Sequence, residues 1–281
     1  MPLIKPATLP WNQAPGREEE DTPQLSATPL SRAPTEPPWV ARSVKMLPWV
    51  RLPSKWIEDR GLRDFGWGRG EGANNTAALM VLAALTHQTD AVGTAAFTYD
   101  RACRATGLSR AKVSAGLKVL IERSLIERGS ARSSFRLSGY DKESGWAKFP
   151  AARLYRDGAI VSFQGINLRK RVELDALKLY YLFASRRDRK TGAAVITYQT
   201  IEDYSGVPRN NIRAALTWLA AEVLVHIDHV PSRIGEGHII NAYRLVHLDN
   251  RQHMGTSWRA QLLDSGMLPT RSPSPMPTDD Y

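Results

Sequence analysis

Apolar residues between positions 77 and 140 recur first at helical and then at strand spacing. A nearly unbroken apolar run from Ala77 to Leu85 follows Asn74-Asn75-Thr76, which predicts a capped helix that is buried on all sides. Further along, Ser109 precedes apolar residues at i, i+4, i+7 and i+8, the spacing of one helical face. The predicted elements are a helix from Ala77, a strand at 95–97, helices at 99–106 and 109–123, and a hairpin of strands at 125–128 and 135–138.

The same pattern occurs a second time, about 99 residues later. Aligned without a gap, residues 77–127 and 176–226 share 11 identities in 51 positions. An upstream block from Trp49 to Pro53 matches the block from Trp146 to Pro150 with a shift of 97 residues. We therefore expect two copies of one domain, a first repeat at 46–140 and a second repeat at 146–249.

The second repeat predicts the same order of elements as the first. Its third helix opens at Pro208, where the first repeat has Ser109, and proline is favourable in the first turn of a helix. The predicted elements are a helix at 174–185, a strand at 195–196, helices at 197–205 and from Pro208, and a hairpin of strands at 224–229 and 242–247.

The order of helix, strand, helix, turn, helix and hairpin resembles the winged helix-turn-helix family. The residues that carry this resemblance are Thr98-Tyr99, Gly107-Leu108-Ser109-Arg110, Val113, Leu117, Leu120 and Leu125-Ile126, with their counterparts from Thr197 to Val225. The resemblance implies a mainly α fold with small β-hairpins, of the α+β class. Two tandem copies, each opened by a strand that ends in proline, also resemble plasmid replication initiators and phage replisome organisers.

The ends of the chain differ in composition from the two repeats. Residues 1–45 hold nine of the 18 prolines, and residues 250–281 are similarly rich in proline, so we expect both to be disordered tails. The formal net charge of +10 arises between them: residues 46–140 contribute +6 and residues 141–250 contribute +4. This distribution favours a polyanionic partner for the repeats.

In the winged-helix family the third helix lies in the major groove and the hairpin, called the wing, contacts phosphate. For the first repeat the resemblance implies DNA contacts from the third helix by Ser109, Arg110, Lys112, Ser114 and Lys118. It implies contacts from the wing by Arg128, Arg132, Ser133 and Arg136. Residues 109–136 carry a net charge of +5, so we expect the first repeat to be the main reader of DNA.

The second repeat has a weaker charge at the corresponding place, with only +1 over residues 208–235. The resemblance implies DNA contacts by Arg209, Asn210, Asn211 and Arg213 of its third helix and by Arg233 of its wing. Asparagine suits the N6 and N7 edge of adenine. We expect this repeat either to read an adjacent groove or to mediate dimerisation.

Other chemistries find little support in the sequence. Cys103 is the single cysteine, and His226 and His229 are three apart, which places them on opposite faces of a strand. The tyrosine pair Tyr180-Tyr181 lacks the partners that strand nicking needs, and Trp49 and Trp146 are expected to anchor packing. We therefore predict no catalysis, no metal site and no cofactor.

The sequence predicts a sequence-specific protein that binds double-stranded DNA, either a transcription regulator or a replication initiator of a plasmid or other mobile element. The alternative is a winged-helix scaffold for protein interactions, without specific reading of DNA. Expected partners are double-stranded DNA, a second copy of the chain and, through the tails, the replication or transcription machinery. The longest apolar run has nine residues, which predicts no membrane span and a cytoplasmic protein, nucleoid-associated if bacterial.

Overall fold

The computed structural model describes residues 46–68, 70–131, 133–141, 143–231 and 239–248, which form an α+β fold. The tails predicted at 1–45 and 250–281 lie outside the described residues, as do Arg132 and Arg233. Among the residues that are described, no helix has the length and apolar character needed to cross a membrane.

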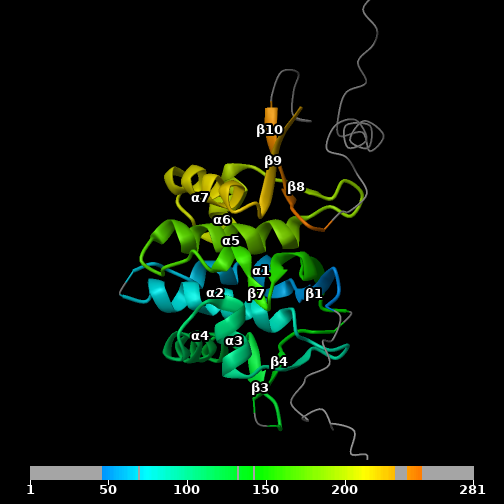
Figure 1. The fold of residues 1–281 in the computed structure, drawn as a ribbon. Helices are drawn as coiled ribbons and strands as arrows, with labels where there is room; N and C mark the ends of the chain where they lie inside the picture. Colours follow the sequence, from blue (N-terminus) through cyan, green and yellow to red (C-terminus); the bar gives the residue numbers. More distant parts are fainter. Residues whose placement is uncertain (1–45, 69, 132, 142, 232–238, 249–281) are drawn as a thin grey trace, which may run out of the picture. The chain divides into compact units, whose positions relative to one another are not determined.

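The first repeat contains the predicted order of elements (Figure 1). After β1 (Trp49–Pro53), α1 (Lys55–Glu58) and the 3-10 turn η1 (Gly61–Asp64), its elements are α2 (Gly72–Thr86), β2 (Thr94–Ala96), α3 (Tyr99–Thr106), α4 (Arg110–Glu122), β3 (Ile126–Arg128) and β4 (Ser134–Leu137). The strands form an antiparallel sheet in the order β2-β4-β3.

The first helix of this repeat begins five residues earlier than predicted, at Gly72. The reason is that the polar residues taken as its cap lie inside the helix with their side chains satisfied. The Thr76 hydroxyl donates to the carbonyl of Gly72 one turn back, at 2.8 Å, and the Asn75 amide donates to the carbonyl of Gly66, at 2.7 Å. The cap prediction at 74–76 was therefore wrong, although the burial of the helix was predicted correctly.

Helices α3 and α4 and the turn between them follow the sequence prediction closely. The Thr98 hydroxyl accepts from the backbone of Arg101 at the start of α3, and Gly107 ends that helix with φ +73°. The Ser109 hydroxyl then accepts from the backbone of Lys112 and caps α4. These contacts satisfy backbone groups that the helix ends would otherwise leave unpaired.

The elements of the second repeat are β5 (Trp146–Pro150), the 3-10 turn η2 (Ala152–Leu154), β6 (Tyr155–Arg156), β7 (Ala159–Ile160), the 3-10 turn η3 (Val161–Phe163), α5 (Arg171–Arg186), β8 (Ala193–Val195), α6 (Tyr198–Ser205), α7 (Arg209–Ala221), β9 (Val225–Pro231) and β10 (Ile239–Leu245). Its sheet has the order β8-β10-β9. The second repeat has the same order as the first from its long helix α5 onward, but ahead of that helix it has a short β6–β7 hairpin between two 3-10 turns where the first repeat has α1 and η1. Helix α7 begins at Arg209, one residue later than predicted, and Pro208 is the residue before it.

The two repeats are joined by pairing of their opening strands. β1 and β5 form an antiparallel ribbon in which Arg51 lies opposite Lys148, its own counterpart in the repeat. Trp49 pairs with Pro150 and, reciprocally, Pro53 pairs with Trp146. In a two-fold interface, if residue i of one unit contacts residue j of the other, then residue j of the first unit contacts residue i of the second. The β1–β5 pairs follow this rule.

Side-chain contacts outside the ribbon follow the same reciprocal scheme. Arg63 near the end of η1 donates to the carbonyl of Asp203 in α6, at 2.9 Å, and Gln164 after η3 donates to the carbonyl of Ala105 in α3, at 3.3 Å. In each repeat, a side chain from the segment ahead of the long buried helix thus donates a hydrogen bond to α3 or α6 of the other repeat. These reciprocal contacts indicate an approximate two-fold relation between the two repeats.

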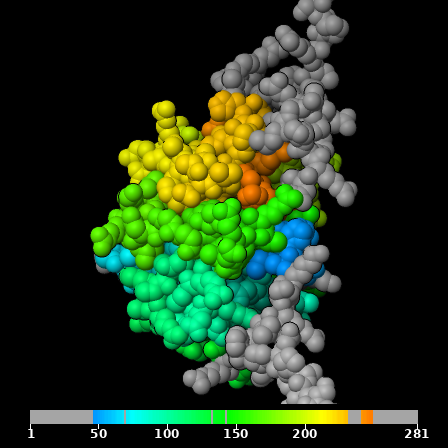
Figure 2. Space-filling model, in the orientation of Figure 1, coloured from blue at the N-terminus to red at the C-terminus, as the bar shows by residue number. Residues whose placement is uncertain are grey.

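The first helices, α2 and α5, form the centre of one hydrophobic core that extends through both repeats. The Tyr181 hydroxyl of α5 donates to the carbonyl of Leu79 in α2 at 2.8 Å, in a fully buried position. In Figure 1, α7, α5, α2 and α4 follow one another as layers, and Figure 2 shows the green atoms of the second repeat packed directly against the teal atoms of the first. Tyr180 and Tyr181 are both buried in this core.

Candidate nucleic-acid interface

The outward face of α4 carries most of the predicted reading residues of the first repeat. Its apolar side chains, with Gly116, pack against α2, and a Cβ on Gly116 would lie 3.1 Å from the backbone of Ala77. This close approach turns Arg110, Ser114 and Lys118 to the surface, where all three are exposed. Helix α4 therefore presents polar and cationic side chains along one exposed stripe.

Two of the cations on this stripe have acidic neighbours. Arg110 pairs with Asp100 of α3, and Lys118 lies 3.7 Å from Glu122, one turn along α4. The side chains in both pairs are more than half exposed. Exposed ion pairs of this kind contribute about 0–1 kcal/mol, so a phosphate or a guanine edge can replace the acid at little cost.

Lys112 is placed differently from the other predicted readers. It is half-buried, and its ammonium donates to the side-chain oxygen of Asn74 in α2, at 3.0 Å. The Ser109 hydroxyl is also engaged, because it accepts the cap hydrogen bond from the backbone of Lys112. Both residues lie at the start of α4, but their polar atoms hold the helix in place.

The hairpin of the first repeat places its predicted contacts on an exposed edge. Arg136 alternates with the buried Phe135 and Leu137, so its side chain lies on the outward face of β4. Arg128 is exposed, and its guanidinium lies 5.9 Å from the ring centre of Phe135. Ser133 occupies the turn with φ +61°. Arg132 falls outside the described residues, so its prediction stays open.

One cation that contributes to the charge of +5 is structural. The Arg123 guanidinium lies 3.9 Å from the ring centre of Phe65 and donates to the carbonyl of Asp64 and to the side chain of Asn75. Burial lowers the pKa of Arg123. This arginine fastens the end of α4 to the segment before α2 and is not available to a ligand.

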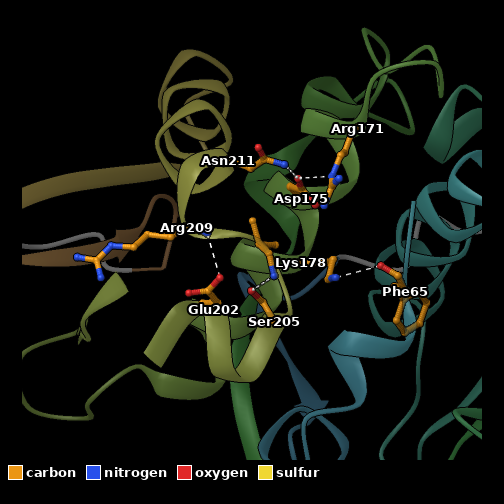
Figure 3. Close-up of polar contacts among 9 residues, drawn as sticks. Phe65, Arg171, Asp175, Lys178, Glu202, Ser205, Arg209 and Asn211 are labelled. Atoms are coloured by element: carbon orange, nitrogen blue, oxygen red, sulfur yellow. Dashed lines mark hydrogen bonds and ion pairs between the residues drawn. The ribbon is translucent and has the colours of Figure 1, made fainter. Parts of the chain in front are cut away.

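In the second repeat, α7 exposes Arg209, Asn210 and Arg213. Asn211 instead donates to the carboxylate of Asp175 in α5 at 3.2 Å, and that carboxylate also accepts from Arg171, at 3.3 Å (Figure 3). The backbone of Arg209 donates to the side chain of Glu202. Arg233 lies outside the described residues.

Lys112 and Asn211 are counterparts in the 99-residue repeat, and both turn to the first helix of their own repeat. The sequence suggested readers at both positions, because their residue types suit DNA. The signal that could have corrected this is Asp175, a carboxylate within a largely apolar helix that needs a partner, whereas Asn74 stands ahead of the apolar run and gives no such signal.

A buried lysine that the sequence did not suggest lies between the repeats. Lys178 of α5 is 3% exposed, and its ammonium donates to the carbonyl of Phe65 at 3.0 Å (Figure 3). Burial lowers its pKa to about 8, although the nearby Asp175 carboxylate opposes this shift. The contact joins α5 to the segment before α2.

The described residues hold no group of three or more histidine, cysteine, aspartate or glutamate side chains that could bind a metal ion. The Nε2 atom of His226 lies 3.3 Å from the carboxylate of Asp228 on β9, and Cys103 is half-buried in α3. Burial raises the pKa of Tyr180 and of Tyr181 well above the ordinary value for tyrosine, which keeps both phenols protonated.

The basic segments flanking α5 divide into two kinds. Arg169 and Lys170 are exposed ahead of the helix. Arg186, at its end, stacks on the ring of Tyr204 at 4.0 Å, and Arg60 approaches the same ring at 5.6 Å. The first group is accessible to a phosphate, whereas Arg186 packs against the second helix of its own repeat.

No family model, no curated protein and no solved structure matches the chain.

Proposed function

We propose that this protein binds double-stranded DNA through two tandem winged helices, with the first repeat as the main reader. The observation that carries the proposal is the exposed stripe of Arg110, Ser114 and Lys118 on a capped helix, beside a hairpin that exposes Arg128 and Arg136. A helix with this chemistry fits the major groove, and arginine pairs with the O6 and N7 atoms of guanine. The hairpin arginines suit phosphate oxygens.

The approximate two-fold relation suggests how both repeats can act on one DNA molecule. Helices α4, α2, α5 and α7 are four packed layers, and three interaxial distances of about 8–10 Å give about 24–30 Å from α4 to α7. Successive turns of the major groove are about 34 Å apart. The span is shorter than this spacing, so the reading of two inverted half-sites by a single chain, as by a symmetric dimer, is the part of the proposal that selection of a preferred duplex tests. Because their side chains differ, the two half-sites would be unlike.

The proposal covers a transcription regulator and a replication initiator, both acting on DNA in the cytoplasm. A second candidate function, a docking module for another protein, is favoured by the exposed apolar residues Leu47 and Val92, which are 65% and 63% exposed. A docking module does not need the cationic stripe of α4.

The test begins with selection of a preferred duplex from a random pool, followed by titration of the labelled duplex with the full chain. Affinity should fall steeply with salt, with a log–log slope that corresponds to roughly 6–10 phosphate contacts. Arg110→Ala should reduce the preference between sequences, and Arg128→Ala should weaken binding to all sequences alike.

Lys55→Ala is the matched control, because Lys55 is an exposed cation with its own acidic partner, Asp59, and lies away from the stripe. It should leave affinity unchanged. A flat response to salt, or equal behaviour of all three variants, contradicts the proposal.

A further inference from the structure

The outward face of the β1–β5 ribbon carries a column of aromatic and cationic side chains. The Trp49 and Trp146 rings stack on each other, with centres 5.8 Å apart and planes 3° from parallel. The Lys148 ammonium lies 4.8 Å from the Trp49 ring centre, and the Arg51 guanidinium lies 5.4 Å from the Trp146 ring centre. The order along the column is thus Lys148, Trp49, Trp146 and Arg51.

The Arg51 end of this column opens into a pocket of about 220 Å³. Its wall includes Arg51 and Trp146 from the column, Arg136 from β4, and Val92, Tyr140 and Asp141 from the adjoining loops. Aromatic and aliphatic surfaces therefore meet two guanidinium groups in one hollow. This combination suits a ligand that is both flat and anionic.

In the part of the chain that the structure describes, the acid at the rim of the pocket, Asp141, forms no ion pair with either of the two pocket arginines. Within the described ranges, no hydrogen bond or ion pair is made by the guanidinium of Arg51 or of Arg136. The carboxylate of Asp141 at the rim accepts from the backbone of Glu143 and from the backbone and hydroxyl of Ser144. Asp141 therefore stabilises its own turn.

The approximate symmetry of the two repeats is broken at this pocket. At the other end of the column stands Lys148, whose ammonium has no flat face on which a ring can stack. The counterpart of Arg136 is Arg244, because their strand partners, Thr94 and Ala193, are equivalent in the repeat. Arg244 is buried, with 7% of its surface exposed, whereas Arg136 is exposed. Arg51, with its planar guanidinium, and the exposed Arg136 therefore lie together at one end of the column, in the pocket.

We propose that this pocket binds an unpaired nucleotide, with the base stacked on the Arg51 guanidinium and the phosphate paired with Arg136. The base would form the next layer of the column, and stacking of bases on guanidinium planes is a common mode of single-strand recognition. The nucleotide is either a free mononucleotide or an unpaired residue of a DNA strand. The inference extends the proposed function from duplex to single-stranded DNA. If the nucleotide belongs to a DNA strand, the inference rests on the proposed function; if the nucleotide is free, it does not.

The test measures binding of the full chain to a labelled ten-residue oligothymidylate and to AMP. Base stacking contributes about 1–3 kcal/mol, so Arg51→Lys, which keeps the charge and removes the plane, should weaken binding by about fivefold or more. Arg136→Gln should weaken it similarly. Lys148→Arg, the reciprocal change at the other end, should leave the affinity unchanged. Tight binding of AMP indicates a free nucleotide, and binding of the oligonucleotide alone indicates a DNA strand.

Unchanged affinity in Arg51→Lys, or an equal loss in Lys148→Arg, overturns the proposal. Arg136 is exposed, so Arg136→Gln supplies a variant whose folding is not in question, and thermal unfolding checks the other two. Arg110→Ala separates this proposal from duplex reading, because it should weaken duplex binding and leave oligothymidylate binding intact. Either proposal can therefore fail while the other stands.

Discussion

The two repeats have equivalent backbone devices at equivalent positions, although few of their side chains agree. Thr98 and Thr197 each cap a second helix, and Gly107 and Gly206 end those helices with φ +73° and +66°. After the third helix, Ser124 and Val223 adopt φ +56° and +54° in spite of their different chemistry. The comparison shows that the order of elements depends on a small set of caps and turns.

Some of the side chains that differ are titratable or cationic. In four pairs of counterparts, at least one residue is titratable or cationic and the two side chains differ in their chemistry. These pairs are His87 and Arg186, Leu79 and Lys178, Lys112 and Asn211, and Arg51 and Lys148. Each repeat therefore contains an internal control for the other. Changing one member of a pair and then its counterpart isolates the chemistry from the shared framework.

The largest expected effect concerns His87 in acid. Its ring is buried, stacks on Phe149 and shares a hydrogen bond of 2.9 Å with the Tyr155 hydroxyl. Burial lowers its pKa to about 3, so below pH 6.5 the unfolded chain binds a proton that the folded chain does not. Stability should fall by about 4 kcal/mol as the pH drops from 6.5 to 3, and His87→Phe should lack this part.

Urea unfolding of the two proteins at a series of pH values measures this difference. The counterpart variant Arg186→Gln should keep the full acid dependence. If His87→Phe and the unchanged protein lose stability in parallel, the buried neutral histidine is not its source.

A slightly smaller effect is expected from Lys178 in alkali. Its pKa is lower in the folded chain than in the unfolded chain, so burial of the charge costs stability below pH 8. This cost, about 3 kcal/mol, should be relieved as the pH rises from 8 toward 10.5. Lys178→Met should lack that rise, whereas Leu79→Met at the counterpart position should keep it. The unfolding free energies of the two variants, measured from pH 8 to 10.5, should therefore diverge. Parallel curves would contradict a cost from the buried lysine charge.

The contrast between the third helices should appear in DNA binding. Arg110→Ala removes an exposed cation from the more basic repeat, and we expect a loss of about 1–3 kcal/mol in affinity for the selected duplex. Arg209→Ala in the second repeat should cost less. Titration of each variant with the same duplex at one salt concentration gives the two values. A larger loss for Arg209→Ala would make the second repeat the main reader.

The smallest effect should come from the turn after each third helix. Val223 is a β-branched residue with positive φ, 58% exposed, and this conformation is strained for its side chain. Val223→Gly should therefore stabilise the protein by about 1 kcal/mol, and Ser124→Gly should do so by less. Thermal unfolding measures both shifts, and a destabilised Val223→Gly would show that the strain is compensated by packing.

Much of the local structure was predictable, because caps and apolar spacing act over a few residues. Ser109, Gly107 and Thr98 were assigned their roles correctly, and the third helix of the first repeat was placed within a residue of its bounds. The start of α2 was wrong, because Asn74 and Asn75 find partners through contacts that a local pattern does not contain.

The sequence could not predict the pairing of β1 with β5, which joins strands about 97 residues apart. Trp49 and Trp146 were expected to anchor packing, but they stack on each other on the outward face of the ribbon and are not among the residues packed against the core. This stacking depends on the pairing of β1 with β5. For the same reason the pocket beside Arg51, and the burial of Lys178 against a distant carbonyl, had no local signal. Lys112 and Asn211 were candidate readers because their residue types suit DNA contacts. Only the packing of the third helices against α2 and α5 shows that their side chains bond to Asn74 and Asp175.

The reciprocal β1–β5 ribbon also bears on how the protein would respond to its own concentration. A symmetric reader made of two separate chains must first associate, so its occupancy of a site rises as a steep function of the amount of protein. Here both halves belong to one polypeptide and meet at a fixed effective concentration, whatever the protein level. A DNA-binding protein built in this way would occupy its sites in a graded manner, in proportion to the number of molecules present.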